Sequence, residues 1–136
     1  MNPILKNILA VIAGLVVGII VNGGLIYLSP SIIPPPAGVD MMTPEGLEAG
    51  MKLLQPKHFI MPFLAHALGT LAGAFITTKV AANNHFRLAL LVGVLFLAGG
   101  IAAANMIPAP TWFIALDLIG AYLPMAWLGN KLGNRN

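Results

Sequence analysis

The stretch ILKNILAVIAGLVVGIIVNGGLIYL, residues 4–28, decides the fold class. Only Lys6, Asn7 and Asn22 interrupt its apolar character. A helix needs about 20 mainly apolar residues to cross the hydrocarbon core of a bilayer. The stretch is too long for the apolar part of a signal peptide, and no Ala-x-Ala-like cleavage site follows it before Ser29. We therefore predict a retained transmembrane helix.

Three further apolar stretches of similar length follow, over residues 59–82, 86–107 and 111–132. Ser29-Pro30 is expected to end the first helix, because proline cannot continue the hydrogen-bond ladder. Pro108 and Pro110 close the third stretch, and Thr111 is a suitable N-cap for the fourth. The connections at residues 83–85 and 108–110 are tight and favour antiparallel neighbours. The sequence thus predicts one all-α membrane domain over residues 1–136, an antiparallel bundle of four transmembrane helices.

The overall composition agrees with lipid as the main solvent. The chain has 136 residues, a mean hydropathy of +0.89 and 8 % charged residues, whereas soluble domains have about 25 %. Its net charge of +3 rests on seven dispersed lysines and arginines, which is not the clustered basic face of a nucleic-acid binder. The absence of cysteine from the sequence excludes disulfides, thiolate metal sites and thiol catalysis.

The distribution of positive charge predicts the orientation. Short cytoplasmic loops are enriched in lysine and arginine. Two lysines, Lys52 and Lys57, fall on one side of the predicted spans, and five basic residues fall on the other: Lys6, Lys79, Arg87, Lys131 and Arg135. We therefore expect both termini in the cytoplasm, in a bacterial cytoplasmic (inner) membrane.

The long connection over residues 29–58 is then an outer segment. It contains Pro34-Pro35-Pro36, which favours stiff extended backbone. Thr43-Pro44-Glu45 is typical of a helix start, with a capping threonine, a proline in the first turn and an acid behind it. We predict a short amphipathic helix over about residues 44–54, lying on the membrane surface or across the mouth of the bundle.

Small residues recur at every fourth position in two of the predicted helices. Gly14 and Gly18 lie in the first helix, and Gly69 and Gly73 in the second. Such spacing lets helix backbones approach closely in lipid. Two interpretations stay open: tight packing within one chain, or a face, Gly14 and Gly18 above all, that contacts another copy in a homo-oligomer.

The polar residues inside the spans are the candidate functional residues, because ionisable groups in a bilayer are costly and mark functional sites. His66 and Asp117 are the ionisable ones. The other polar residues of this set are Asn22, Asn105, Thr70 and Tyr122. From the helical rise, Asn22 and Asp117 lie about 9 Å deep, His66 about 10 Å and Asn105 about 3–5 Å. Each helix therefore contributes one polar group to an expected layer in the outer leaflet, and we predict that Asp117 lies close to His66.

This layer has two interpretations. It is either a hydrogen-bonded polar knot that fixes helix register, or a ligand or proton site open to the outer side with the outer segment as its lid. Pro62 and Pro124 are expected to kink their helices around it. An enzyme needs room for a substrate beside the two side chains, whereas a structural knot needs a direct, dry hydrogen bond.

No recognisable catalytic motif accompanies this layer in the sequence. Ser29 and Ser31 lack a nucleophile context, the histidines lack metal-ligand spacing, and no phosphate-binding loop is present in the sequence. We predict no metal and no cofactor. The leading hypothesis is a non-enzymatic, oligomeric binding or transport component, or an accessory subunit, whose partners are membrane lipids or a small-molecule or lipid ligand. The alternative is a membrane enzyme acting on a lipid or small amphiphile, with His66 as base and Asp117 orienting it. A scaffold that binds a partner protein is the third.

Overall fold

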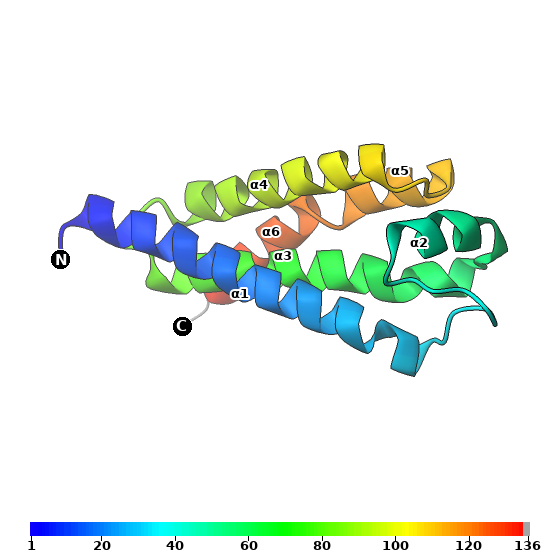
Figure 1. Cartoon of the computed structure of the whole chain (residues 1–136). Helices are drawn as coiled ribbons and strands as arrows, with labels where there is room; N and C mark the ends of the chain where they lie inside the picture. The colour runs from blue at the N-terminus through cyan, green and yellow to red at the C-terminus, as the bar shows by residue number, and fades with distance from the viewer. Residues whose placement is uncertain (135–136) are drawn as a thin grey trace.

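The computed structural model describes residues 1–134, and these residues form helices and connecting turns without a β-strand (Figure 1). Four helical segments are long and apolar enough to cross a membrane: Pro3–Ile32, Pro56–Val80, His85–Met106 and Thr111–Gly133. The chain is therefore an all-α membrane protein with four candidate transmembrane segments.

The first segment is a single helix, α1 (Pro3–Ile32), which starts where the Asn2 side chain accepts a 2.7 Å hydrogen bond from the Ile4 N–H. The prediction that it ends at residue 28 is wrong, because α1 continues through Pro30 to Ile32. A proline removes one N–H donor, and the last turn closes without it through the Ile33 N–H and the Ser29 carbonyl. At 1.5 Å per residue α1 is about 45 Å long, more than the hydrocarbon thickness of about 30 Å.

The second segment joins a short 3-10 helix, η2 (Pro56–Phe59), to the helix α3 (Ile60–Val80). Pro62 therefore lies in the first turn of α3. Since the first N–H groups of a helix have no intrahelical partner, Pro62 removes no hydrogen bond from α3. The expectation of a kink at this proline is corrected accordingly.

The third segment is α4 (His85–Met106), and the fourth consists of two helices, α5 (Thr111–Gly120) and α6 (Leu123–Gly133). The break falls at Tyr122, whose backbone angles are φ −114° and ψ −77°, and Pro124 stands in the first turn of α6. Thr111 does not cap α5: Pro110 holds that position, and its carbonyl accepts from the N–H groups of Phe113 and Ile114.

Helices α1 and α3 interlock through their glycines. A Cβ on Gly14 would lie 2.5 Å from the Gly73 carbonyl oxygen, and one on Gly18 would lie 2.8 Å from the carbonyl oxygen of Gly69. Gly14 meets residue 73 of α3, whereas Gly18, one turn further along α1, meets residue 69. The two helices therefore run in opposite directions. Gly14 and Gly18 are buried against α3. The interpretation that they face another copy of the chain is therefore wrong.

Helices α1 and α4 lie close together at one end of the molecule and separate towards the end that carries α2 (Pro44–Gly50) (Figure 1). The helix predicted over residues 44–54 is observed as α2 followed by a 3-10 turn, η1 (Met51–Leu53). Thr43 caps it by accepting a 3.0 Å hydrogen bond from the Gly46 N–H. The helix tightens after Gly50, whose missing side chain makes room for Val39.

The two ends of the connecting segment, residues 33–59, are joined to each other through both nitrogens of one histidine. Nδ1 of His58 accepts from the Gln55 N–H at 2.8 Å, and Nε2 donates to the Pro34 carbonyl at 3.2 Å. Met51, Phe59 and Phe113 form a small apolar core between this segment and α5. The segment is thus folded against the helix ends that carry His66 and Asp117.

Candidate functional site

The centre of the candidate site is a direct contact between His66 of α3 and Asp117 of α5. Nδ1 of His66 lies 2.8 Å from Oδ1 and 2.9 Å from Oδ2 of Asp117. A carboxylate only accepts, so Nδ1 donates its hydrogen and a neutral imidazole keeps Nε2 as an acceptor. The Asp117 side chain is 7 % exposed and that of His66 is 25 % exposed. The Asp117 carboxylate is therefore buried, while part of the His66 side chain remains accessible.

Tyr122 completes this contact from the break in the fourth segment. Its hydroxyl donates to Oδ2 of Asp117 at 3.3 Å, and its ring stacks on the His66 ring with 5.9 Å between centroids. In an unbroken helix residues 117 and 122 would point about 140° apart. The interruption between α5 and α6 turns the tyrosine back towards the aspartate, so the irregular backbone serves the site directly.

Two more of the predicted residues lie beside this group. Thr70 stands one turn after His66 on α3 and donates to the His66 carbonyl at 2.8 Å. Asn22 of α1 lines the same cavity as His66, Thr70 and Tyr122. Its Oδ1 is buried and, in the described part of the chain, accepts no hydrogen bond. A buried acceptor without a donor is uncommon and calls for an explanation such as a ligand or an ordered water.

Asn105 does not join the group, which corrects the expectation of one polar residue from each helix. It is exposed, its Nδ2 donates to the Ile101 carbonyl of its own helix at 3.1 Å, and it lines a different cavity. Helix α4 buries its other face, through Ala89, Val92 and Gly93. Depth along a helix is set by the residue number, but the direction of the side chain is set by helix rotation, and here it points away.

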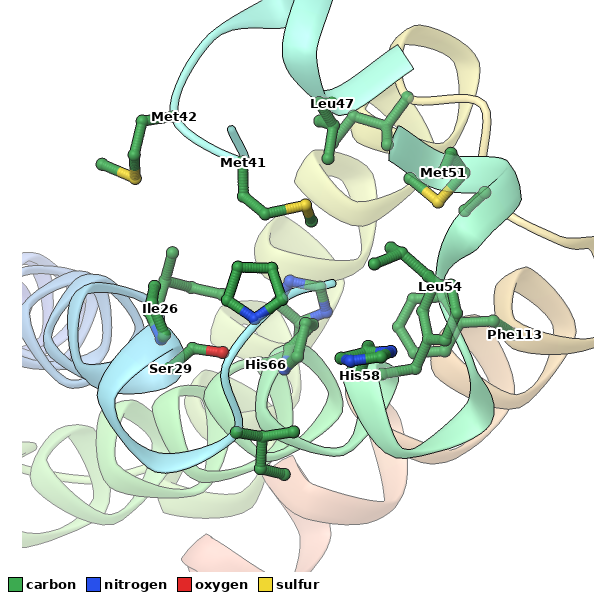
Figure 2. A pocket seen from close by; sticks show the side chains of 17 residues that line it. Ile26, Ser29, Met41, Met42, Leu47, Met51, Leu54, His58, His66 and Phe113 are labelled. Atoms are coloured by element: carbon green, nitrogen blue, oxygen red, sulfur yellow. The ribbon is translucent and has the colours of Figure 1, made fainter. Parts of the chain in front are cut away.

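Three cavities meet at His66. The first, of about 240 Å³, lies under the connecting segment, with Met41, Met51 and Leu47 on one side and His58 and His66 on the other (Figure 2). The second, of about 400 Å³, is a groove between α1 and α4. The third, of about 60 Å³, lies between α4 and α5 and reaches Asp117. His66 therefore has both features: a direct hydrogen bond to Asp117 and empty space beside its ring.

Sequence reasoning missed two features of this site. His58 lines the first cavity and joins the two ends of the connecting segment, and Gly99 leaves the groove between α1 and α4 open, since nothing lies within 4 Å of a Cβ built there. Neither carries a local signal, because both depend on packing between distant elements. Within residues 1–134, no three His, Asp or Glu side chains group in a way that would hold a metal ion. That the site works without metal or cofactor stays a prediction.

The chain matches no protein-family model, no curated protein and no solved structure. The geometry around His66 is therefore the basis for the functional proposal.

Proposed function

We propose that the chain is a membrane-embedded binding protein for a small amphiphile, whose polar end is held at His66 and whose apolar part lies between the helices. The observation that carries this proposal is the accessible edge of His66. Asp117 occupies Nδ1, and among residues 1–134 Nε2 has no hydrogen-bond partner. A histidine fixed on one side and bordered by cavities on the other is suited to hold a ligand group.

The alternative of a purely structural knot explains less. A knot requires the hydrogen bond between His66 and Asp117, but it does not require cavities of about 240 and 400 Å³ bordering the histidine. Binding sites for small molecules are mostly apolar clefts with a few convergent polar groups, and this description fits both cavities. The unpartnered Oδ1 of Asn22 also favours a ligand over a closed network.

We place the site in the outer leaflet of a bacterial cytoplasmic membrane, with both termini inside and the connecting segment outside. Support comes from the charge asymmetry of the short loops. In this orientation the connecting segment covers the outer mouth of the antiparallel bundle. A binding protein of this size suits an accessory subunit or a transport component. A homo-oligomer would have to use faces other than Gly14, Gly18, Gly69 and Gly73, which are occupied within the chain.

A second candidate function, an enzyme that acts on the bound amphiphile, is favoured by one observation. A carboxylate that holds Nδ1 of a histidine fixes the ring and leaves Nε2 ready to take a proton from a substrate. The arrangement of Asp117 and His66 has this form. Turnover of the bound molecule would separate this function from binding alone.

Native mass spectrometry of the protein released gently from its membrane tests the binding proposal. Wild-type protein is expected to carry a small-molecule or lipid adduct that survives mild activation. Asp117→Asn is expected to lose most of this adduct, because an amide can donate to Nδ1 as well as accept from it and so no longer fixes the state of Nε2. Adduct occupancy at matched activation energy is the quantity to compare.

Asn105→Ala is the matched control, because Asn105 is a membrane-helix asparagine outside the His66 group. It should keep the wild-type occupancy. Equal occupancy in wild type and Asp117→Asn, or no adduct in either, would argue for the structural knot instead.

A further inference from the structure

The groove between α1 and α4 has apolar walls and a polar floor. Its walls come from Leu15 and Ile19 of α1 and from Leu95, Phe96 and Gly99 of α4. Its floor holds the polar side chains of four residues: Asn22, His66, Thr70 and Tyr122. A site of this form matches a molecule with a long apolar part and a small polar head.

The opening of the groove between α1 and α4 faces the lipid bilayer. Two of its own wall residues, Ile19 of α1 and Leu95 of α4, are exposed large apolar side chains, as expected of a surface that faces lipid. The two helices separate towards the α2 end (Figure 1), and Gly99 leaves their gap unfilled. The other large cavity at His66 lies under the connecting segment, whose two ends His58 joins through Pro34 and Gln55. A molecule in the bilayer can therefore reach His66 between α1 and α4, without passing beneath the connecting segment.

The floor of the groove selects the head group. Oδ1 of Asn22 is an acceptor without a donor from residues 1–134, and Nε2 of His66 is a second one when the imidazole is neutral. Asp117 adds a buried carboxylate directly behind His66. No lysine or arginine of the described chain lines the three cavities that meet there. A phosphate or carboxylate head would have to be buried near a like charge without a cation, which is unfavourable.

We propose that the ligand is a neutral, hydroxyl-bearing amphiphile that enters sideways from the bilayer through the groove between α1 and α4. This inference rests on the proposed binding function and names its ligand class and route. A hydroxyl donates one hydrogen bond and accepts others. It donates to Nε2 of His66 or to Oδ1 of Asn22 and accepts from the asparagine amide. Long-chain alcohols, glycerides and phenolic lipids belong to this class, whereas fatty acids and phospholipids do not.

A photoreactive long-chain alcohol, with a diazirine near the end of its chain, tests the proposal on the full-length protein in nanodiscs of neutral lipid. Labelled peptides are identified by mass spectrometry, with hexadecanol and hexadecanoic acid as competitors. We expect labels on the α1 and α4 walls of the groove and displacement by hexadecanol. The acid should compete at least about tenfold less well, which corresponds to the loss of one good hydrogen bond together with the cost of burying its charge.

The matched variants are Gly99→Phe and Gly24→Phe. Both glycines are in helices with open space at Cβ, so both variants are expected to fold, which thermal unfolding in the same nanodiscs checks. Only Gly99 lines the groove. Gly99→Phe should reduce labelling about tenfold, in line with the steric cost of filling a binding cleft, and Gly24→Phe should leave it unchanged.

Each contrary result overturns a distinct part of the account. If hexadecanoic acid competes as well as hexadecanol, the ligand class is wrong while the site stands. If labels fall on residues 33–59 and Gly99→Phe labels like the wild type, the lateral route is wrong. If the photoreactive alcohol does not label the groove, and its labelling elsewhere is the same in Asp117→Asn as in the wild type, the proposed binding function itself fails.

Discussion

Replacing His66 by phenylalanine should lower the free energy of unfolding by about 2–3 kcal/mol, because it leaves a buried carboxylate without its main partner. Asp117 is 5 % exposed, and after the substitution the Tyr122 hydroxyl, at 3.3 Å, is the only side-chain group among residues 1–134 that still donates to its carboxylate. Titration with dodecyl sulfate in mixed micelles, followed by circular dichroism, measures this loss.

The double variant His66→Phe/Asp117→Leu separates structure from function. Replacing a buried polar pair by apolar side chains of similar size is often neutral or stabilising, so stability should return to within about 1 kcal/mol of the wild type, the remainder reflecting the Tyr122 hydroxyl left without an acceptor. The adduct seen by native mass spectrometry should stay absent. A double variant that is as unstable as the single one would mean that the pair is kept to hold the fold.

Gly14→Ala should destabilise the protein by about 3 kcal/mol, the upper range for a group forced into a filled interface. A Cβ at this position would meet the Thr77 hydroxyl and lie 2.5 Å from the Gly73 carbonyl oxygen. The backbones of α1 and α3 would have to separate. That movement would also lengthen the hydrogen bond of 3.1 Å from the Thr77 hydroxyl to the Ala10 carbonyl. The same micelle titration measures the effect.

Gly24→Ala is the control for helix propensity, since it makes the same chemical change in the same helix with nothing within 4 Å of the new methyl group. Alanine is favoured over glycine in helices by about 1 kcal/mol, so this variant should be as stable as the wild type or slightly more so. Equal behaviour of the two variants would contradict the close approach of α1 and α3 at Gly14.

The sequence was sufficient to place the four spans, because each depends on a local property, a run of apolar residues long enough for a bilayer. Their ends and interruptions were harder to predict, since the effect of proline depends on its place in the helix. Pro30 stands in the last turn of α1 without ending it, and Pro62 stands in the first turn of α3, where no hydrogen bond is lost. Only Pro124 accompanies a real break.

The candidate site was predictable in part for a related reason. Ionisable groups buried in lipid must find partners, so the contact between His66 and Asp117 could be predicted from their similar depth. Depth alone also selected Asn105, which lies on the exposed side of α4 and bonds to its own helix. The cavities could not be predicted, because they arise where α1 and α4 separate and where residues 33–59 fold back over the helix ends.

Nitrogen NMR of histidine-labelled protein in lipid bilayers tests the central claim most directly, because the chain has only three histidines and His66→Phe identifies the signals of His66. We expect a hydrogen on Nδ1, held by Asp117, and an Nε2 without hydrogen whose signal shifts when hexadecanol is added, while the signals of His58 and His85 stay unchanged. A hydrogen on Nε2, or an Nε2 signal that no amphiphile moves, would contradict a ligand site at His66.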